Sequence, residues 1–457
     1  MRTLTATVAA LFLAAGAVPA AAASPAGPPD TDGVWRMDGY GTVLVLGHGV
    51  LQEYQTTSVS CVKGDTSRQT GPGTYAATDG SVLTVRTVHD RDHALFAADS
   101  SVGHRKLRRL NALPAGCARP ATTDPRTAFD VFWQTFEENY PFFAQKHIDW
   151  QAVRDRYRPL VHQDTTKDEL FGIFSRMVRP LYDAHVGVMD GDRVFAQVRP
   201  GTEMPSPELD TRVKRFIVAR DLKDASYRQD FGAGRITYAD LPGDLGYLRI
   251  SGFGGYAGEH APYTAERAEL DRALNTVLTP GRTQRLKGLV IDLRINGGGS
   301  DTLGIRIAQR LTDTPYTAYA KRARNDPADP ARHTRPEPVP VVPAHAPRYT
   351  GPVAVLTGGS TVSAGETFTQ ALMDRPGRTV RIGQPTQGVF SDVLMRNLPD
   401  GLIFGLPNEE YLTRTGRTFD GTGIAPLLAE PVFTKEEFAK NRDSAFDRAV
   451  NLLSGRG

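Results

Sequence analysis

The sequence carries little net charge and, beyond its N-terminus, lacks any apolar run long enough to span a membrane. The formal net charge is +3 over 457 residues, which gives no basis for binding to nucleic acid or to a membrane surface. We also find no internal repeat. A chain of this length predicts two or three domains, each large enough to bury a core of its own. Its oligomeric state cannot be read from these features.

The N-terminus has the pattern of a secretory signal peptide. Arg2 precedes an apolar run at residues 8–18, which is followed by Pro19 and by alanines at residues 20–23. A membrane anchor is the alternative, but the alanines supply little hydrophobicity for it. We therefore assign residues 1–23 to a signal peptide and residues 24–32 to a disordered lead-in, and expect a secreted or extracytoplasmic protein.

Cysteine is also scarce. Cys61 and Cys117 are the only two in the chain, and an oxidising compartment allows them to form a disulfide. Two free buried thiols are the alternative. Short β-branched runs separated by Gly and Asp fill the surrounding region, so residues 33–121 are predicted to form a small all-β module with one disulfide.

The pattern changes after this module. Residues 122–200 are predicted to form a helical subdomain that carries His185 at the end of its helical run. Its core is predicted to consist of aromatic side chains at Phe129, Phe132, Phe136, Tyr140 and Phe143. From residue 235 onward strands alternate with helices, which predicts a layered α/β domain over residues 201–457. Residues 194–230 are hard to assign and residues 327–347 are proline-rich. Lys321, Arg322 and Arg324 are interpreted as a solvated basic loop, or alternatively as a site for a substrate carboxylate.

Two short segments suggest chemistry. In the first, an apolar strand delivers the glycines at residues 297–299 just before a helix, an arrangement that lets another group approach main-chain N–H donors. A phosphate loop is excluded because no G-x-G-x-x-G and no Gly-Lys-Ser/Thr is present. In the second, a strand at residues 353–356 leads to Ser363 at the start of a helix. Ser363 and Glu366 also fit a capping box, so a plain helix cap is the alternative to a nucleophile.

A serine nucleophile needs a base, and the sequence has no histidine after residue 345. This excludes the α/β-hydrolase order of Ser, Asp and His. The base must then lie upstream of Ser363. His185 is the best placed because it ends a helical run and follows Asp183 by two residues, although a structural role for it stays open.

Seven motifs follow one another along the chain, namely YPFF…IDW, LYDAH, GYLRISGF, DLRINGGG, STVSAGE, IGQPTQG and DGTGIAP. In this order they resemble the S41 peptidase family, which includes C-terminal processing proteases, the tricorn core and retinoid-binding modules. The resemblance runs from about residue 129 to residue 437 and leaves the β module uncovered. It implies a crotonase/ClpP-like layered α/β core with a helical subdomain that contributes the base. No segment resembles a PDZ domain.

The resemblance also implies roles for single residues. Ser363 would be the nucleophile, with the main-chain N–H groups of Gly298 and Ala364 as the oxyanion hole. His185 would be the general base, as in the tricorn-like branch, because Val389 stands where other branches carry a lysine. The acid that orients His185 is left open among Asp420, Asp183 and Glu410, since Asp420 replaces a family glutamate.

These features together predict a secreted serine endopeptidase that acts on polypeptides and uses no cofactor or metal. It is expected to bind no nucleic acid and, after signal cleavage, no membrane. The alternative is a non-catalytic binding protein for a hydrophobic ligand or peptide on the same fold.

Overall fold

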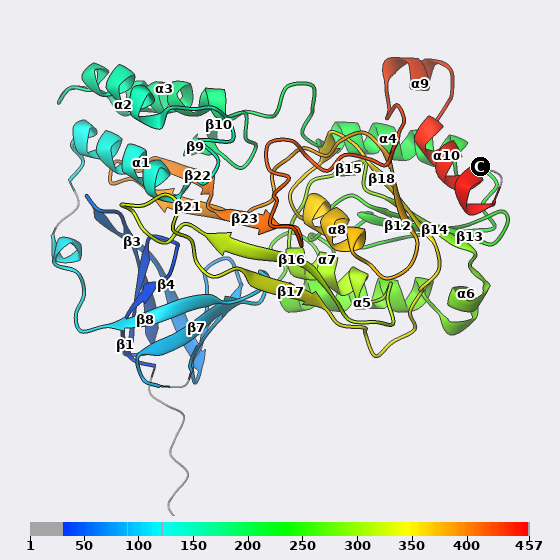
Figure 1. The fold of residues 1–457 in the computed structure, drawn as a ribbon, viewed down its shortest axis with the longest axis horizontal. Helices are drawn as coiled ribbons and strands as arrows, with labels where there is room; N and C mark the ends of the chain where they lie inside the picture. Colours follow the sequence, from blue (N-terminus) through cyan, green and yellow to red (C-terminus); the bar gives the residue numbers. More distant parts are fainter. Residues whose placement is uncertain (1–30, 89, 120–121, 456–457) are drawn as a thin grey trace, which may run out of the picture. The chain divides into compact units, whose positions relative to one another are not determined.

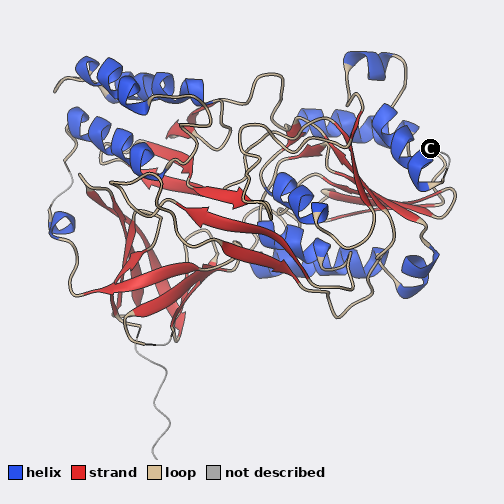
Figure 2. Cartoon of the chain, viewed as in Figure 1, coloured by secondary structure: helices blue, strands red, loops and turns tan. Residues whose placement is uncertain are grey.

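We describe a computed structural model of the chain over residues 31–88, 90–119 and 122–455 (Figures 1 and 2). The predicted signal peptide at residues 1–23, and residues 24–30 of the predicted lead-in, lie outside the described residues. None of the helices within the described ranges combines the length and the apolar character needed to cross a bilayer.

The N-terminal module is a closed barrel of eight strands, each antiparallel to the next. Its interior holds large side chains such as Trp35, Tyr75 and Leu107, all at most 1% exposed. A disulfide joins Cys61 to Cys117, which confirms the predicted pairing. The strands are β1 (Gly33–Met37), β2 (Thr42–Gly47), β3 (Val50–Thr56), β4 (Cys61–Gly71), β5 (Thr74–Ala76), β6 (Val82–Thr87), β7 (His93–Ala98) and β8 (Arg105–Leu110). Cys117 lies in the short 3-10 helix η1 (Ala115–Ala118).

Three helices follow, α1 (Pro125–Asn139), α2 (Trp150–Tyr157) and α3 (Lys167–Val178). Asp124, Asp149 and Thr166 cap their N-termini through side-chain oxygens, which satisfies main-chain N–H groups that a helix start leaves free. Their aromatic stripe is core, as predicted, with Phe143 only partly buried.

These helices pack on a sheet that the sequence did not reveal. Its strand order is β10 (Arg193–Ala196), β9 (Gly187–Asp190), β22 (Ile403–Pro407) and β21 (Val393–Asn397). Two of these strands lie in the region predicted to be helical and two in the α/β region. The helices therefore share one core with Leu398, Leu402, Phe404 and Leu406, which come from much later in the chain.

The α/β region is built on a seven-stranded sheet in the order β11, β12, β13, β14, β18, β20, β24. The five strands β13, β14, β18, β20 and β24 are parallel to one another, and β11 and β12 add an antiparallel edge. The bounds are β11 (Tyr227–Phe231), β12 (Ile236–Leu241), β13 (Leu245–Ile250), β14 (Gly288–Asp292), β18 (Val353–Thr357), β20 (Thr379–Gly383) and β24 (Leu428–Ala429).

Helices cover both faces of this sheet, which confirms the predicted layered α/β arrangement (Figure 2). One face packs against α4 (Pro207–Arg220) and α10 (Ser444–Leu453). The other packs against α5 (Tyr263–Val277), α7 (Asp301–Ala308) and α8 (Ala364–Met373). Figure 1 shows α4 and α10 above the sheet and α5 below it. The remaining helices are α6 (Pro280–Arg285), α9 (Lys435–Ala439) and the 3-10 turns η2 (Arg158–Leu160) and η3 (Arg179–Leu181).

Two regions differ from their predictions. Helix α4 occupies the stretch that was hard to assign. The basic residues are not a solvated loop, because Lys321 and Arg322 lie within the strand β16 (Tyr316–Ala323), and Lys321 and Arg324 are only 8% and 7% exposed. Strand β16 pairs with β17 (Glu337–Val341), from the proline-rich stretch, and with β23 (Glu409–Leu412). The positive charge of Lys321 is balanced by Glu409 at 3.0 Å.

Candidate active site

Ser363 lies at the turn between strand and helix that the sequence predicts. The chain leaves β18, passes the two-residue strand β19 (Ser360–Thr361) and enters α8 directly after Ser363. Ser363 has φ +55° and ψ −121°, a conformation that costs a non-glycine residue about 1–3 kcal/mol. Its side chain is half-buried. The N–H of Ala364, the first residue of the helix, accordingly has no intrahelical acceptor and lies at the positive end of the helix dipole.

The glycine loop lies directly against Ser363. Strand β15 (Ile295–Asn296) pairs in parallel with β19, which aligns the loop after β15 with the turn that carries Ser363. A Cβ atom placed on Gly298 would lie 2.6 Å from the Cβ of Ser363, and Gly298 has φ +81°. Only glycine fits there. The Gly298 N–H donates to Oδ1 of Asn296 at 2.9 Å, while the Asn296 amide donates to the Ile250 carbonyl.

Glu366 anchors the start of α8 from inside the protein. Its carboxylate is fully buried and accepts hydrogen bonds from the N–H groups of Gly388 and Val389 at 2.6 and 2.8 Å. It also accepts from the Ser363 N–H at 3.3 Å, which is the glutamate half of the predicted capping box. Burial raises the pKa of Glu366 to about 8, in spite of these N–H donors.

Residues 388–392, which we call the bridging segment, connect the groups around Ser363. The carbonyl of Val389 accepts the Ser363 N–H at 3.1 Å. One residue later, the Phe390 N–H donates to Oδ1 of Asp420 at 3.2 Å. Val389, which stands where other branches of the family that the sequence resembles carry a lysine, is buried.

His185 contacts the same segment. It lies between η3 and β9, and the main chain of Ser391 is among the groups that act on the pKa of its imidazole. Ser363 bonds to Val389, and Ser391 acts on His185, so the two positions are two residues apart, or at most roughly 7 Å along the chain. Within the described ranges, no hydrogen bond joins His185 to Ser363. Such bonds are often long without substrate and tighten when it binds.

Burial and two nearby acids act on the imidazole of His185. Burial lowers its pKa below the ordinary value of 6.5, and the negative charges of Asp183 and Asp392 oppose this shift. Its Nδ1 is buried and has no hydrogen-bond partner among the described residues. Asp183 accepts the main-chain N–H of His185 at 3.1 Å and the Tyr140 hydroxyl at 2.8 Å.

The three acids left open by the sequence have different surroundings. Asp420 is buried, accepts from Thr418 and Phe390, and has a pKa raised to about 7 by burial and by the charge of Asp183. Asp183 and Asp420 therefore lie close enough for their charges to interact, and Asp183 also acts on the imidazole of His185. Glu410 is engaged elsewhere, since it pairs with Arg322 at 2.7 Å and with His333 at 3.0 Å.

Comparison with known proteins agrees with this arrangement. Residues 244–428, which include the glycine loop, Ser363 and the bridging segment, match the model of peptidase family S41. Residues 121–179, the helical layer before His185, match the C1 domain of tricorn protease. Residues 244–428 belong to peptidase family S41.

Relatives of this S41 chain are distant. A carboxy-terminal-processing protease of Bartonella bacilliformis (strain ATCC 35685 / KC583 / Herrer 020/F12,63) is 26% identical over 296 residues, which cover 58% of the chain and 62% of that relative. The chain thus spans less than two thirds of the relative's length. The crystal structure of a candidate peptidase from Parabacteroides merdae ATCC 43184 is similar at 25% identity and a TM-score of 0.61, covering 74% of the chain and 98% of that structure. The mature CPAF structure shares the fold at 12% identity and a TM-score of 0.52, covering 73% and 98%.

Sequence reasoning did not identify several residues of this S41 site. The sequence indicates Asn296 only as the neighbour of three glycines, and it gives no signal for Asp392. Tyr140 was assigned to the core, and its hydroxyl also binds Asp183. A buried carboxylate or amide beside a catalytic motif leaves no periodic signal, so only the pairing of distant segments reveals it. Within the described residues, no three His, Cys, Asp or Glu side chains gather in a way that suits a metal ion.

Proposed function

We propose that the chain is an exported serine endopeptidase that hydrolyses peptide bonds through an acyl-enzyme on Ser363, with His185 as general base. The observation that carries the proposal is the bridging segment. Its Val389 carbonyl accepts the Ser363 N–H, and its Ser391 main chain acts on the imidazole of His185. Because one segment lies against both residues, a nucleophile and a base from distant parts of the chain have a common support.

The proposed reaction follows acyl-transfer chemistry. His185 takes the hydroxyl proton of Ser363 as Oγ attacks the peptide carbonyl, and then gives it to the leaving amine. A neutral imidazole is required for the first step, and burial of His185 favours the neutral form at neutral pH. Water then hydrolyses the ester on Ser363, again with His185 as base.

The proposed oxyanion hole consists of the N–H groups of Ala364 and Gly298. The Ala364 N–H is free by its position at the helix start, whereas the Gly298 N–H is already oriented by Asn296. The oxyanion would share this second donor with the Asn296 side chain. Loss of one such donor typically costs about 3 kcal/mol of transition-state stabilisation.

For the acid that orients His185 we propose Asp183. Its charge acts on the imidazole, and it holds the main chain of His185 in place. Asp420 supports the bridging segment through Phe390. We also propose that the core is of the crotonase/ClpP type, on the S41 resemblance. The predicted signal peptide supports export to an extracytoplasmic compartment, with polypeptides as substrates.

A non-catalytic binding protein on the same fold is the second candidate. It is favoured by one observation, namely that within the described residues no hydrogen bond connects His185 to Ser363. In this case the hydroxyl of Ser363 would have no activated state, and the site would bind a peptide or an apolar ligand without cleaving it.

A fluorophosphonate probe distinguishes the two candidates. We expect it to label the wild-type protein and not Ser363→Ala, with labelling of His185→Ala slower by a factor on the order of 10³ or more. Ser454→Ala, which removes an exposed serine at the end of α10, is the matched control and should label like the wild type. Labelling that persists in Ser363→Ala would refute the nucleophile. Absence of both labelling and peptide cleavage in the wild type would favour the binding protein.

A further inference from the structure

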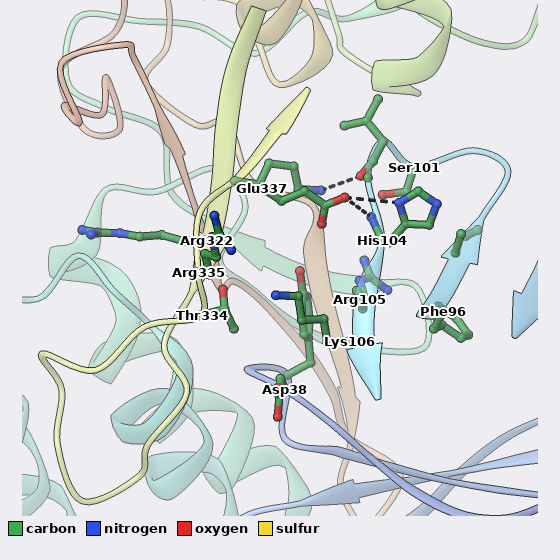
Figure 3. Close-up of a pocket in the computed structure, with 16 residues that line it drawn as sticks. Asp38, Phe96, Ser101, His104, Arg105, Lys106, Arg322, Thr334, Arg335 and Glu337 are labelled. Carbon is green, nitrogen blue, oxygen red and sulfur yellow. Dashed lines mark hydrogen bonds and ion pairs between the residues drawn. The ribbon is translucent and has the colours of Figure 1, made fainter. Parts of the chain in front are cut away.

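The bridging segment ends at Asp392, and the barrel holds this residue. Oδ2 of Asp392 accepts a hydrogen bond from the Ser101 hydroxyl at 2.6 Å and lies 3.5 Å from Nη2 of Arg105. Both residues belong to the N-terminal barrel, in the turn before β8 and at its first position. Figure 3 shows them beside a pocket lined by the barrel and by β16 and β17.

The groups that hold Asp392 are themselves fixed. The guanidinium of Arg105 lies 4.5 Å from the ring centre of Tyr40, whose hydroxyl donates to Glu409. On the other side, Nζ of Lys321 lies 3.4 Å from Asp392 and donates to the carbonyl of Val102 at 3.2 Å. Strands of the barrel and of the α/β region thus meet around one carboxylate.

Asp392 is charged in this setting. Burial raises the pKa of an aspartate, but the positive charges of Lys321 and Arg105 outweigh burial and lower the pKa of Asp392 to about 2. A permanently ionised carboxylate with a hydroxyl donor and two cations forms charge-assisted contacts, which are stronger and more directional than neutral ones.

The position of Asp392 bears on the site because it is three residues from the Ser363 contact at Val389 and one from the His185 contact at Ser391. We propose that the barrel is a positioning module for the active site, in which Ser101 and Arg105 hold Asp392 and thereby fix the bridging segment against Ser363 and His185. The proposal rests on the proposed peptidase function. The sequence suggests no chemistry for the barrel. In this proposal the barrel takes part in the reaction by positioning the catalytic groups.

The same junction offers a matched control. His104 of the barrel contacts Glu337 on β17 at 3.2 Å, a contact drawn as a dashed line in Figure 3. This pair also joins the barrel to the α/β region, but β17 is an edge strand of its sheet and pairs only with β16. Loss of this contact perturbs the junction without touching the bridging segment.

The test compares Asp392→Asn, Ser101→Ala and Arg105→Gln with His104→Ala. For the first three we expect kcat to fall by a factor on the order of 10 to 100, as small misplacements of catalytic groups do. KM should change less than kcat, and thermal unfolding should show each variant folded. His104→Ala should keep the wild-type kcat. Equal losses in all four variants, or none in the first three, would overturn the proposal.

A second readout does not depend on activity. His185 is faced by the charges of Asp183 on its own loop and Asp392 on the bridging segment. Removing the charge in Asp392→Asn should therefore lower the pKa of His185, measured by NMR titration of labelled histidines and assigned with His185→Ala. His104→Ala should leave that titration unchanged. A wild-type protein without labelling at Ser363 would refute the peptidase, while an unshifted His185 titration in Asp392→Asn would refute the link from Asp392 to His185.

Discussion

Ser363 has two roles that compete in most helices and agree here. As the residue before α8 it bonds through its N–H to Glu366, like a helix cap. Its φ of +55°, however, differs from the extended backbone that a helix cap usually has. The strain of this conformation is offset by the buried Glu366 carboxylate, which holds both the helix start and the bridging segment. A serine used only as a helix cap would need neither the positive φ nor the buried carboxylate.

The protonation of His185 sets the pH range of the proposed activity. Its pKa is lowered by burial below 6.5, and the base works only as the neutral imidazole, so activity rises with pH through this pKa. We expect the acid limb of the kcat/KM profile to have its midpoint below pH 6.5. The rate of peptide hydrolysis, measured from about pH 4 to about pH 9, checks this expectation. A midpoint above neutral pH would contradict it.

At the scale of residues, the sequence offers candidates for the reactive groups but not for their supports. Ser363 and His185 stand in recognisable motifs, and their proposed roles stay predictions. The choice among Asp183, Asp420 and Glu410 was not accessible, because it depends on which distant strands pair. The ion pairs of Glu410 with Arg322 and His333 arise only when β23 lies beside β16.

The glycine loop and the turn with Ser363 work as a pair of elements, since β15 and β19 fix their register. In Gly298→Ala the new Cβ would lie 2.6 Å from Ser363 Cβ at a φ that disfavours side chains. We expect the rate of fluorophosphonate labelling to fall by a factor on the order of 100, with the protein still folded.

Gly297→Ala is the control for this substitution. Gly297 is exposed, and a Cβ there would have Pro205 as its nearest contact, at an ordinary 4.0 Å. This variant should label at close to the wild-type rate. Equal loss in both variants would show that the loop tolerates no change at all, and the specific contact between Gly298 and Ser363 would not explain the result.

Local patterns predicted most of the helices and parallel strands, because these have strong periodicity and clear glycine or proline boundaries. They missed α4, although Ser206 caps it and Pro207 begins it. They also missed the sheet of β9, β10, β21 and β22, for a physical reason. Short strands that pair across most of the domain carry no periodic signal of their partner.

For the molecule as a whole, the disulfide is the main covalent restraint. Cys61 and Cys117 are 56 positions apart, and the chain-entropy relation gives about 4 kcal/mol for a loop of this size. We expect the double variant Cys61→Ser, Cys117→Ser to melt at lower temperature than the wild type in calorimetry. Reductant should lower the wild-type melting temperature and leave that of the double variant unchanged. A reductant effect of equal size on both proteins would contradict this account.

The bridging segment also has a consequence for the order in which activity arises. The base comes from the first half of the chain, whereas the nucleophile, the bridging segment and Asp420 come from its last quarter. A ribosome or an export channel delivers the N-terminal barrel and the helical layer long before residues 388–392. During that interval His185 has no bridging segment against it and Ser363 has no anchored turn. In the proposed mechanism, the nascent polypeptide therefore has no assembled active site, and the site forms only when the final segments are in place.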